Sequence, residues 1–247
     1  MAAGRRGREL GARVTLLEAG QIGGTSLNRG PAPVRTLARA ARLANLGGLA
    51  LEAAGVHATS RAVPVDDYLR TNVEHIYAAG DVNGRSMVVQ TARMEGRIAA
   101  TNAVLGASRQ ATYAVVPTGS FTDPEYGRVG LTEAQAAEQH DVVVGIARYD
   151  DLLRPVADGR PDGFCKLIAD RGTRTILGAH VLGEYFAETV QTVAACMAAG
   201  LTVEKVAELQ LAFPTFTEAV SMAAQKICRT LGIGGFPQVW SYLGAED

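Results

Sequence analysis

Residues 162–183, DGFCKLIADRGTRTILGAHVLG, decide the fold class of the second half of the chain. Two short runs rich in apolar and β-branched residues, 163–169 and 175–182, are separated by the polar residues 170–173. This pattern is typical of two strands joined by a hairpin turn. Because hairpin strands are antiparallel, we expect an antiparallel sheet in this half.

The segments on either side of this hairpin extend the same pattern. Strands are predicted over 113–121, 128–131 and 141–149, and helices over 133–139, 184–199, 203–209 and 214–231, with Pro214 near the start of the last one. An antiparallel sheet with segregated helices is an α+β unit.

The first half of the chain has a different pattern. Val14–Leu17 is an unbroken apolar run, as in strands buried on both faces of a parallel sheet. A glycine-rich loop over 19–33 and a helix over 34–46 are expected to follow. A second apolar run, 75–79, precedes Gly80-Asp81 and a helix over 87–104. This half is therefore predicted to be α/β, with a polar boundary at 106–110.

Composition excludes several classes of function. The 24 Lys and Arg residues balance 25 Asp and Glu residues, so no basic surface for nucleic acid or membrane is expected. No apolar stretch approaches the roughly 18 residues that span a bilayer. Three distant cysteines indicate free thiols and a reducing cytoplasm, and four scattered histidines predict no metal site.

Several motifs resemble the pyridine nucleotide-disulfide oxidoreductases, flavoproteins that include dihydrolipoamide dehydrogenase, glutathione reductase and mercuric reductase. VTLLE (14–18), GQIGGTSLNRGPAPVRTL (20–37) and IYAAGDV (76–82) resemble the FAD-binding domain. PTGSFTDPEYGRVGLTEAQA (117–136), the 162–183 stretch and LAFPTFTEA (211–219) resemble the dimerisation domain. The resemblance, nearest to mercuric-reductase-like members, implies a partial FAD-binding Rossmann-like domain at 1–110, a homodimer-forming domain at 111–235 and a tail at 236–247.

The resemblance also implies which residues contact FAD. Glu18 matches the acid that binds the adenosine ribose, and Asp81, after Gly80, matches the aspartate that binds the ribityl chain. The remaining cofactor positions are Gly23, Gly24, Thr25 and Arg35, the last replacing a lysine of the family. From the residues alone, Glu18 is more simply a solvated strand end and Asp81 a turn residue.

The departures from the family concern its catalytic groups. Ser26 and Pro31 occupy the positions of the redox cysteine pair, and neither residue can form a disulfide. Phe213 stands where many members have an acid/base histidine, although mercuric reductase has a tyrosine there. Glu218, which would orient that histidine, is retained. We therefore expect no thiol-disulfide or mercuric-ion chemistry, and we interpret Cys165, Cys196 and Cys228 as buried apolar residues.

The nucleotide-binding loops are also expected to be incomplete. The glycines in residues 2–7 mimic a phosphate-binding fingerprint, but no strand precedes them, so we interpret this segment as part of a helix. Projection back from Glu18 places the true phosphate loop at or before Met1. In the family, an NAD(P)H-binding domain interrupts the FAD-binding domain. GLALEAAGV (48–56) resembles the exit from that domain and no second fingerprint is present, so the resemblance implies a deletion of the nicotinamide domain near residues 43–48. FAD binding is then weakened, and NAD(P)H is not expected to bind.

Three functions remain open at this point. The chain could be a flavin-dependent oxidoreductase with other chemistry, a non-catalytic homodimeric binding or assembly module, or a degraded remnant of the family. The sequence names no substrate and leaves open whether the chain is an enzyme.

Overall fold

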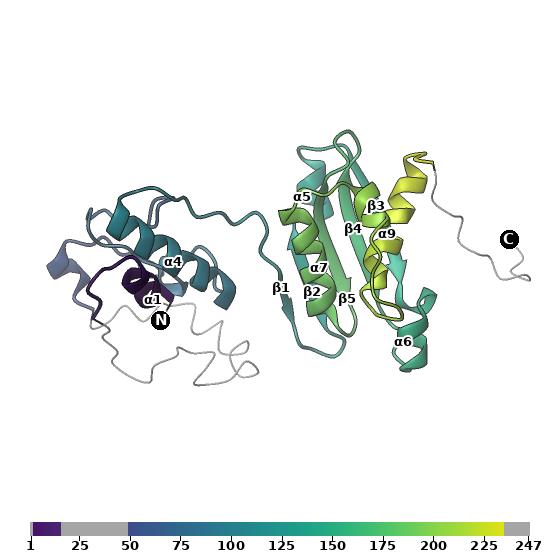
Figure 1. Cartoon of the computed structure of the whole chain (residues 1–247), viewed down its shortest axis with the longest axis horizontal. Coiled ribbons are helices and arrows are strands. Elements are labelled where there is room, and N and C mark those ends of the chain that lie inside the picture. The colour runs from purple at the N-terminus through teal and green to yellow at the C-terminus, as the bar shows by residue number, and fades with distance from the viewer. Residues whose placement is uncertain (1, 16–48, 235–247) are drawn as a thin grey trace, which may run out of the picture. The chain divides into compact units, whose positions relative to one another are not determined.

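The computed structural model describes residues 2–15 and 49–234 of the chain. Two compact units are present, Met1–Tyr113 and Ala114–Asp247, which we call unit 1 and unit 2 (Figure 1). The overall class is mixed α/β, with an antiparallel sheet in unit 2.

Unit 2 is built on a five-stranded sheet with the order β1-β2-β5-β4-β3. Its strands are β1 (Thr118–Ser120), β2 (Tyr126–Gly130), β3 (Val142–Arg148), β4 (Phe164–Asp170) and β5 (Ile176–Leu182). All neighbouring strands are antiparallel, and the predicted hairpin is confirmed as β4–β5, in which Phe164 is paired with Leu182. The α+β prediction for this half is therefore confirmed.

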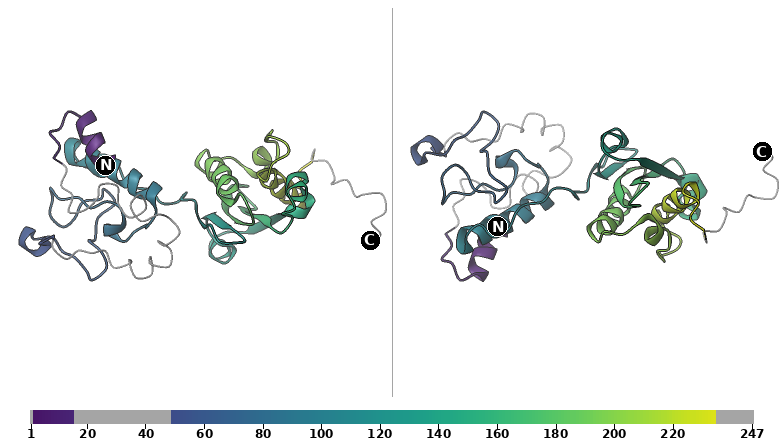
Figure 2. Two further views of the ribbon diagram at one scale, coloured as in Figure 1. Left: turned by 90° about the horizontal axis from the view of Figure 1, so that it is seen from below. Right: turned by 90° about the horizontal axis from the view of Figure 1, so that it is seen from above.

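Helices α7 (Phe186–Ala198) and α9 (Glu218–Thr230) cover one face of this sheet (Figure 2). Gly145 in β3 permits the close approach of α9, because a Cβ there would lie 2.1 Å from the Ala223 carbonyl oxygen. Leu167, Val193 and Ile227 are fully buried in the core between the sheet and these helices. Shorter helical elements complete the unit: α5 (Glu133–Ala137), η3 (Tyr149–Asp151), α6 (Leu153–Ala157) and α8 (Val203–Ala207).

Two predictions for unit 2 were wrong in extent. The strand predicted over 113–121 is reduced to β1, which starts after Pro117, a residue with no N–H to donate to a ladder. The helix predicted to begin near Pro214 begins at Glu218. Phe216, which lies before this helix, is buried with its ring against Tyr149 and Tyr185. The short helix α6 and the turn η3 were not predicted.

Unit 1 contains α1 (Ala2–Glu9), η1 (Leu51–Ala54), η2 (Asp81–Asn83) and α4 (Val89–Leu105). Residues 2–7 are helical, which confirms that their glycines do not form a phosphate loop. Instead α1 packs closely on α4, and the Arg6 side chain donates to the Thr101 hydroxyl at 3.3 Å.

The strand predicted over 75–79 was wrong. Among the described residues of unit 1, this run makes a single isolated bridge, between Arg70 and Tyr77. The Ala78 N–H donates to the Leu69 carbonyl and the Thr71 N–H donates to the Ile76 carbonyl. Residues 75–79 therefore pair with residues 69–71, a segment that lies only a few positions earlier in the sequence. Of the other apolar run, Val14 and Thr15 are not in a strand, and residues 16 and 17 lie outside the described ranges.

Candidate functional site

The predicted cofactor residues Gly80 and Asp81 lie in a tight turn just before α4. Gly80 has φ 85° and ψ −158°, a conformation that is open almost only to glycine. Asp81 then begins the 3₁₀ turn η2, which ends at Gly84. The turn therefore places an aspartate side chain at the surface, directly after a buried glycine.

A buried carboxylate lies beneath this turn. Glu95, on α4, is completely buried. Its Oε2 accepts hydrogen bonds from the Gly80 N–H at 2.5 Å and the Asn83 Nδ2 at 2.9 Å, and its Oε1 accepts one from the Tyr113 hydroxyl at 2.8 Å. Because a buried charge is costly without partners, these three donors account for its presence in the interior.

Partial desolvation and the nearby Glu95 carboxylate raise the pKa of Asp81 above its usual value. Both effects disfavour the ionised form. Asp81 is consequently a carboxylate for which contact with hydrogen-bond donors, such as hydroxyl groups, would be favourable.

Arg85 and Tyr113 form the outer part of the same network. The Arg85 guanidinium lies 5.7 Å from the centre of the Tyr113 ring and donates to the Val65 carbonyl at 2.7 Å and to Asp67 at 3.4 Å. The Arg85 N–H donates to the Asn83 Oδ1 at 2.9 Å. Burial, followed by the hydrogen bond to Glu95, raises the pKa of Tyr113, so its hydroxyl stays protonated at neutral pH.

The start of α4 adds a second kind of group to this site. The residue before the helix is Val88, whose side chain cannot cap the first turn. The N-terminal end of a helix carries a partial positive charge, which attracts anions and polar oxygens.

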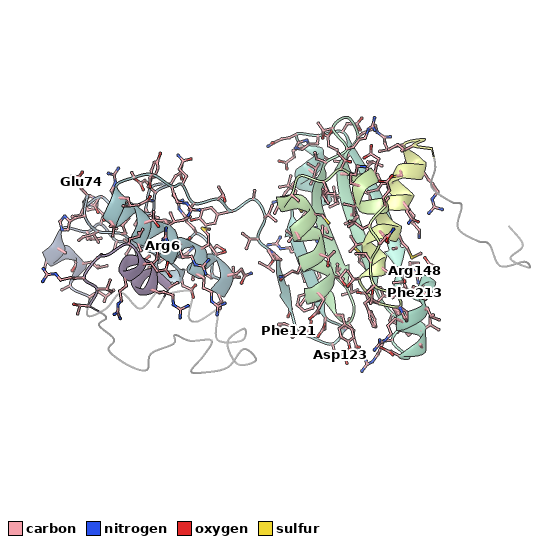
Figure 3. The ribbon with its side chains drawn as sticks, viewed as in Figure 1. Arg6, Glu74, Phe121, Asp123, Arg148 and Phe213 are labelled. Carbon is pink, nitrogen blue, oxygen red and sulfur yellow. The ribbon has the colours of Figure 1, made fainter. Side chains whose placement is uncertain are left out.

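The second group of predicted residues lies in unit 2. Phe213 precedes Pro214 in a cis peptide bond, and its side chain is 68% exposed (Figure 3). Glu218 begins α9, and its Oε2 is buried without a hydrogen-bond partner among the described residues. This burial raises the pKa of Glu218. A phenyl ring cannot carry a proton, so Phe213 itself cannot act as an acid or base.

The three cysteines are all buried and free, as predicted. Burial raises the pKa of Cys165 to about 12 and that of Cys228 to about 11, and it also raises the pKa of Cys196. None of these sulfurs is a thiolate at neutral pH, so none has the reactivity of a redox-active thiol.

Part of the predicted site falls outside the described residues. These positions are Glu18, Gly23, Gly24, Thr25, Ser26, Pro31 and Arg35. The structure brings together Gly80 and Asp81, and it places Phe213 and Glu218 in the other unit. Glu95, Arg85 and Tyr113 were missed by the sequence reasoning, although a glutamate among the small and apolar residues of the α4 face is a signal that could have been noticed.

The described part of this site fits one segment of FAD. Asp81 supplies an acceptor suited to the ribityl hydroxyls, and the partial positive charge at the start of α4 is suited to polar oxygens of the cofactor. Within residues 2–15 and 49–234, no group of three His, Cys, Asp or Glu residues could hold a metal ion. In the same ranges, no helix is both long and apolar enough to cross a membrane.

Comparison with protein families matches both units. Residues 116–224 match the dimerisation domain of pyridine nucleotide-disulphide oxidoreductases, and residues 42–96 match the pyridine nucleotide-disulphide oxidoreductase family. Mercuric reductase from Streptomyces lividans is 39% identical over 185 residues, which are 72% of this chain and 38% of that protein. Dihydrolipoyl dehydrogenase from Mycobacterium tuberculosis is 37% identical over 180 residues, which are 71% of this chain and 39% of that enzyme.

Two solved structures are also similar to this chain. LpdA from Mycobacterium tuberculosis superposes with a TM-score of 0.68 and 26% identity, over 73% of this chain and 40% of that one. The HOCl-induced flavoprotein disulfide reductase RclA from Escherichia coli has a TM-score of 0.65 and 29% identity, over 71% and 41%. The chain thus spans about two fifths of the length of these relatives.

Proposed function

The chain belongs to the pyridine nucleotide-disulfide oxidoreductase family, and we propose that it is an FAD-binding, homodimer-forming protein that does not reduce disulfides or mercuric ion. The observation that supports FAD binding is the turn at Asp81. The turn is fastened to Glu95 of α4 at both ends, through the Gly80 backbone N–H and the Asn83 side-chain amide, and this supports a fixed position for the Asp81 carboxylate.

In this proposal Asp81 accepts hydrogen bonds from the ribityl hydroxyls, and the start of α4 donates to polar oxygens of the cofactor. The raised pKa of Asp81 favours this contact, because hydroxyl donors would compensate its desolvation. When bound, FAD would supply two-electron redox chemistry. Glu18, Gly23, Gly24, Thr25 and Arg35 are proposed as further contacts, from the family resemblance of their motifs.

The absence of disulfide chemistry is proposed from the chain's own groups. The family's two redox cysteines are replaced by Ser26 and Pro31. The three cysteines that the chain does have are buried and have raised pKa values. Phe213 cannot exchange protons with a leaving thiolate. We propose further, from the family resemblance, that the nicotinamide domain is deleted near residues 43–48 and that NAD(P)H therefore does not bind.

The homodimer is proposed from unit 2, whose residues 116–224 match a dimerisation domain. Several large apolar side chains on this unit are exposed, with Phe213 at 68% and Phe121 at 69% (Figure 3). A contiguous exposed apolar patch is typical of protein interfaces, so these side chains are candidates for the dimer contact. These same observations favour a second candidate function, a non-catalytic dimeric module that holds no flavin. A cytoplasmic location fits the free, buried thiols of both candidates.

Titration of FAD into the purified chain separates the two candidates. We expect quenching of flavin fluorescence in the intact chain, at least tenfold weaker binding in Asp81→Ala, and unchanged binding in the control Glu52→Ala, whose side chain is exposed on η1. The loaded protein should not oxidise NADPH with a disulfide acceptor. Absence of quenching in the intact chain would favour the non-catalytic module, and NADPH turnover would contradict the proposal directly.

A further inference from the structure

A closed ring of interactions, three hydrogen bonds and one cation–π contact, links Glu95 to the Asp81 turn. The ring runs from Glu95 to Asn83, from the Asn83 Oδ1 to the Arg85 N–H, from Arg85 to the Tyr113 ring, and from the Tyr113 hydroxyl back to Glu95. Asn83 is the member of this ring that belongs to the turn. The other members can hold the turn in place without contacting a cofactor themselves.

The chemistry of this ring suits a carboxylate at position 95. A carboxylate only accepts hydrogen bonds, and each of its three partners here donates one. Hydrogen bonds to an ionised acceptor are stronger than those between neutral groups. The Gly80 N–H bond of 2.5 Å is the shortest of the three, and it fixes the residue directly before Asp81.

The conformation of Gly80 explains why such a fastening is needed. Glycine at φ 85° and ψ −158° is free to adopt many other conformations. Without the bond to Glu95, this freedom would let the following carboxylate move away from its place beside α4.

We propose that Glu95 is a positioning residue for FAD binding, and that Tyr113 holds Glu95 in the orientation that serves the Asp81 turn. This inference rests on the proposed function, because it assigns a role in the binding of the same cofactor. The hydroxyl of Tyr113 bonds to Oε1 and so orients the carboxylate to present Oε2 to Gly80 and Asn83. Loss of that hydroxyl should therefore weaken FAD binding from a distance.

The test compares two tyrosine-to-phenylalanine variants of the full chain. Tyr113→Phe removes the bond to Glu95. The control Tyr77→Phe removes a hydroxyl that donates to the Asn102 carbonyl, also on α4, at 3.3 Å. Both side chains are half-buried and both bonds end on the same helix, so Tyr77→Phe controls for the loss of a tyrosine hydroxyl bonded to α4. Glu95→Gln is a third variant, because its amide oxygen still accepts from Gly80.

Two readouts are measured for each variant, the dissociation constant for FAD and the exchange rate of the Gly80 amide without FAD. We expect Tyr113→Phe to weaken FAD binding about fivefold, the equivalent of one hydrogen bond, and to accelerate Gly80 exchange by a similar factor. Tyr77→Phe should change neither, and Glu95→Gln should fall between the two. Equal effects of the two tyrosine variants on both readouts would overturn the inference.

The two readouts also separate this inference from the proposed function. If the intact chain binds no FAD, the proposed function is wrong and the amide exchange decides the role of Glu95. Faster Gly80 exchange in Tyr113→Phe alone would then support the fastening of the turn, and unchanged exchange would refute it. If the intact chain binds FAD and Tyr113→Phe binds it equally well, only the positioning role is refuted.

Discussion

Replacement of Gly80 by alanine should destabilise unit 1 more than its backbone conformation alone explains. A non-glycine residue in this region of backbone space costs on the order of 1–3 kcal/mol. The added Cβ would also lie 3.3 Å from the Ala92 Cβ on α4, so turn and helix must separate slightly. That movement stretches the Gly80–Glu95 hydrogen bond, and a bond to a charged group contributes about 1.5–3 kcal/mol.

Gly106 provides the matched control for this prediction. It ends α4 with nearly the same backbone angles, φ 82° and ψ 171°, and no atom lies within 4 Å of its would-be Cβ. Gly106→Ala therefore carries the backbone strain without the contact or the hydrogen bond. Since only part of the Glu95 bond is lost, we expect Gly80→Ala to lower the free energy of unfolding of unit 1 by about 1–2 kcal/mol more than Gly106→Ala.

Native-state hydrogen exchange of the α4 amides, measured without FAD, gives this free energy for unit 1. Peptides from unit 2 serve as an internal reference and should be unaffected by either substitution. Equal losses for Gly80→Ala and Gly106→Ala would refute the reasoning, because the network around Glu95 would then contribute nothing to the stability of the turn.

Three further predictions concern charge and thiol reactivity. Asp81→Asn should stabilise unit 1 at pH 7 by on the order of 0.5 kcal/mol in thermal unfolding, because it removes a carboxylate that desolvation and Glu95 disfavour. Solvent screening limits this gain. The same variant should bind FAD more weakly, and a loss of stability would contradict the assigned cause. The backbone N–H of Thr173, and then His140, lower the pKa of Asp170 below its unfolded value. Its stabilisation of unit 2 is therefore present above about pH 4 and lost as the pH falls through the lower folded value, so Asp170→Asn should flatten the acid side of the stability profile; an unchanged profile would refute this. Maleimide should label none of the three cysteines in the native chain and all of them in urea, and rapid native labelling would contradict their burial.

Local signals explain why the fold of unit 2 was predictable. The β4–β5 hairpin follows from two apolar runs and a polar turn that are adjacent in sequence. The errors arose at two places. Phe216, just before α9, is buried with its ring against Tyr149 and Tyr185, and the helix begins two residues later. Residues 75–79 pair locally, through the Arg70–Tyr77 bridge, in place of the strand predicted there.

The site was predictable only in part, for a related reason. Asp81 was found because its motif, including the glycine before it, is contiguous. Glu95 was missed because its three partners come from two other segments, and a glutamate in a helix that also contains Arg93 and Arg97 is ordinarily solvated. Whether such a charge is buried depends on donors that only the folded chain brings to it.

The most direct measurement of the central claim is the absorption spectrum of the chain after incubation with FAD and removal of free cofactor. We predict a retained flavin band in the intact chain, lost in Asp81→Ala, with no bleaching of that band when NADPH is added under anaerobic conditions. A colourless protein, or a flavin that NADPH rapidly reduces, would contradict the account.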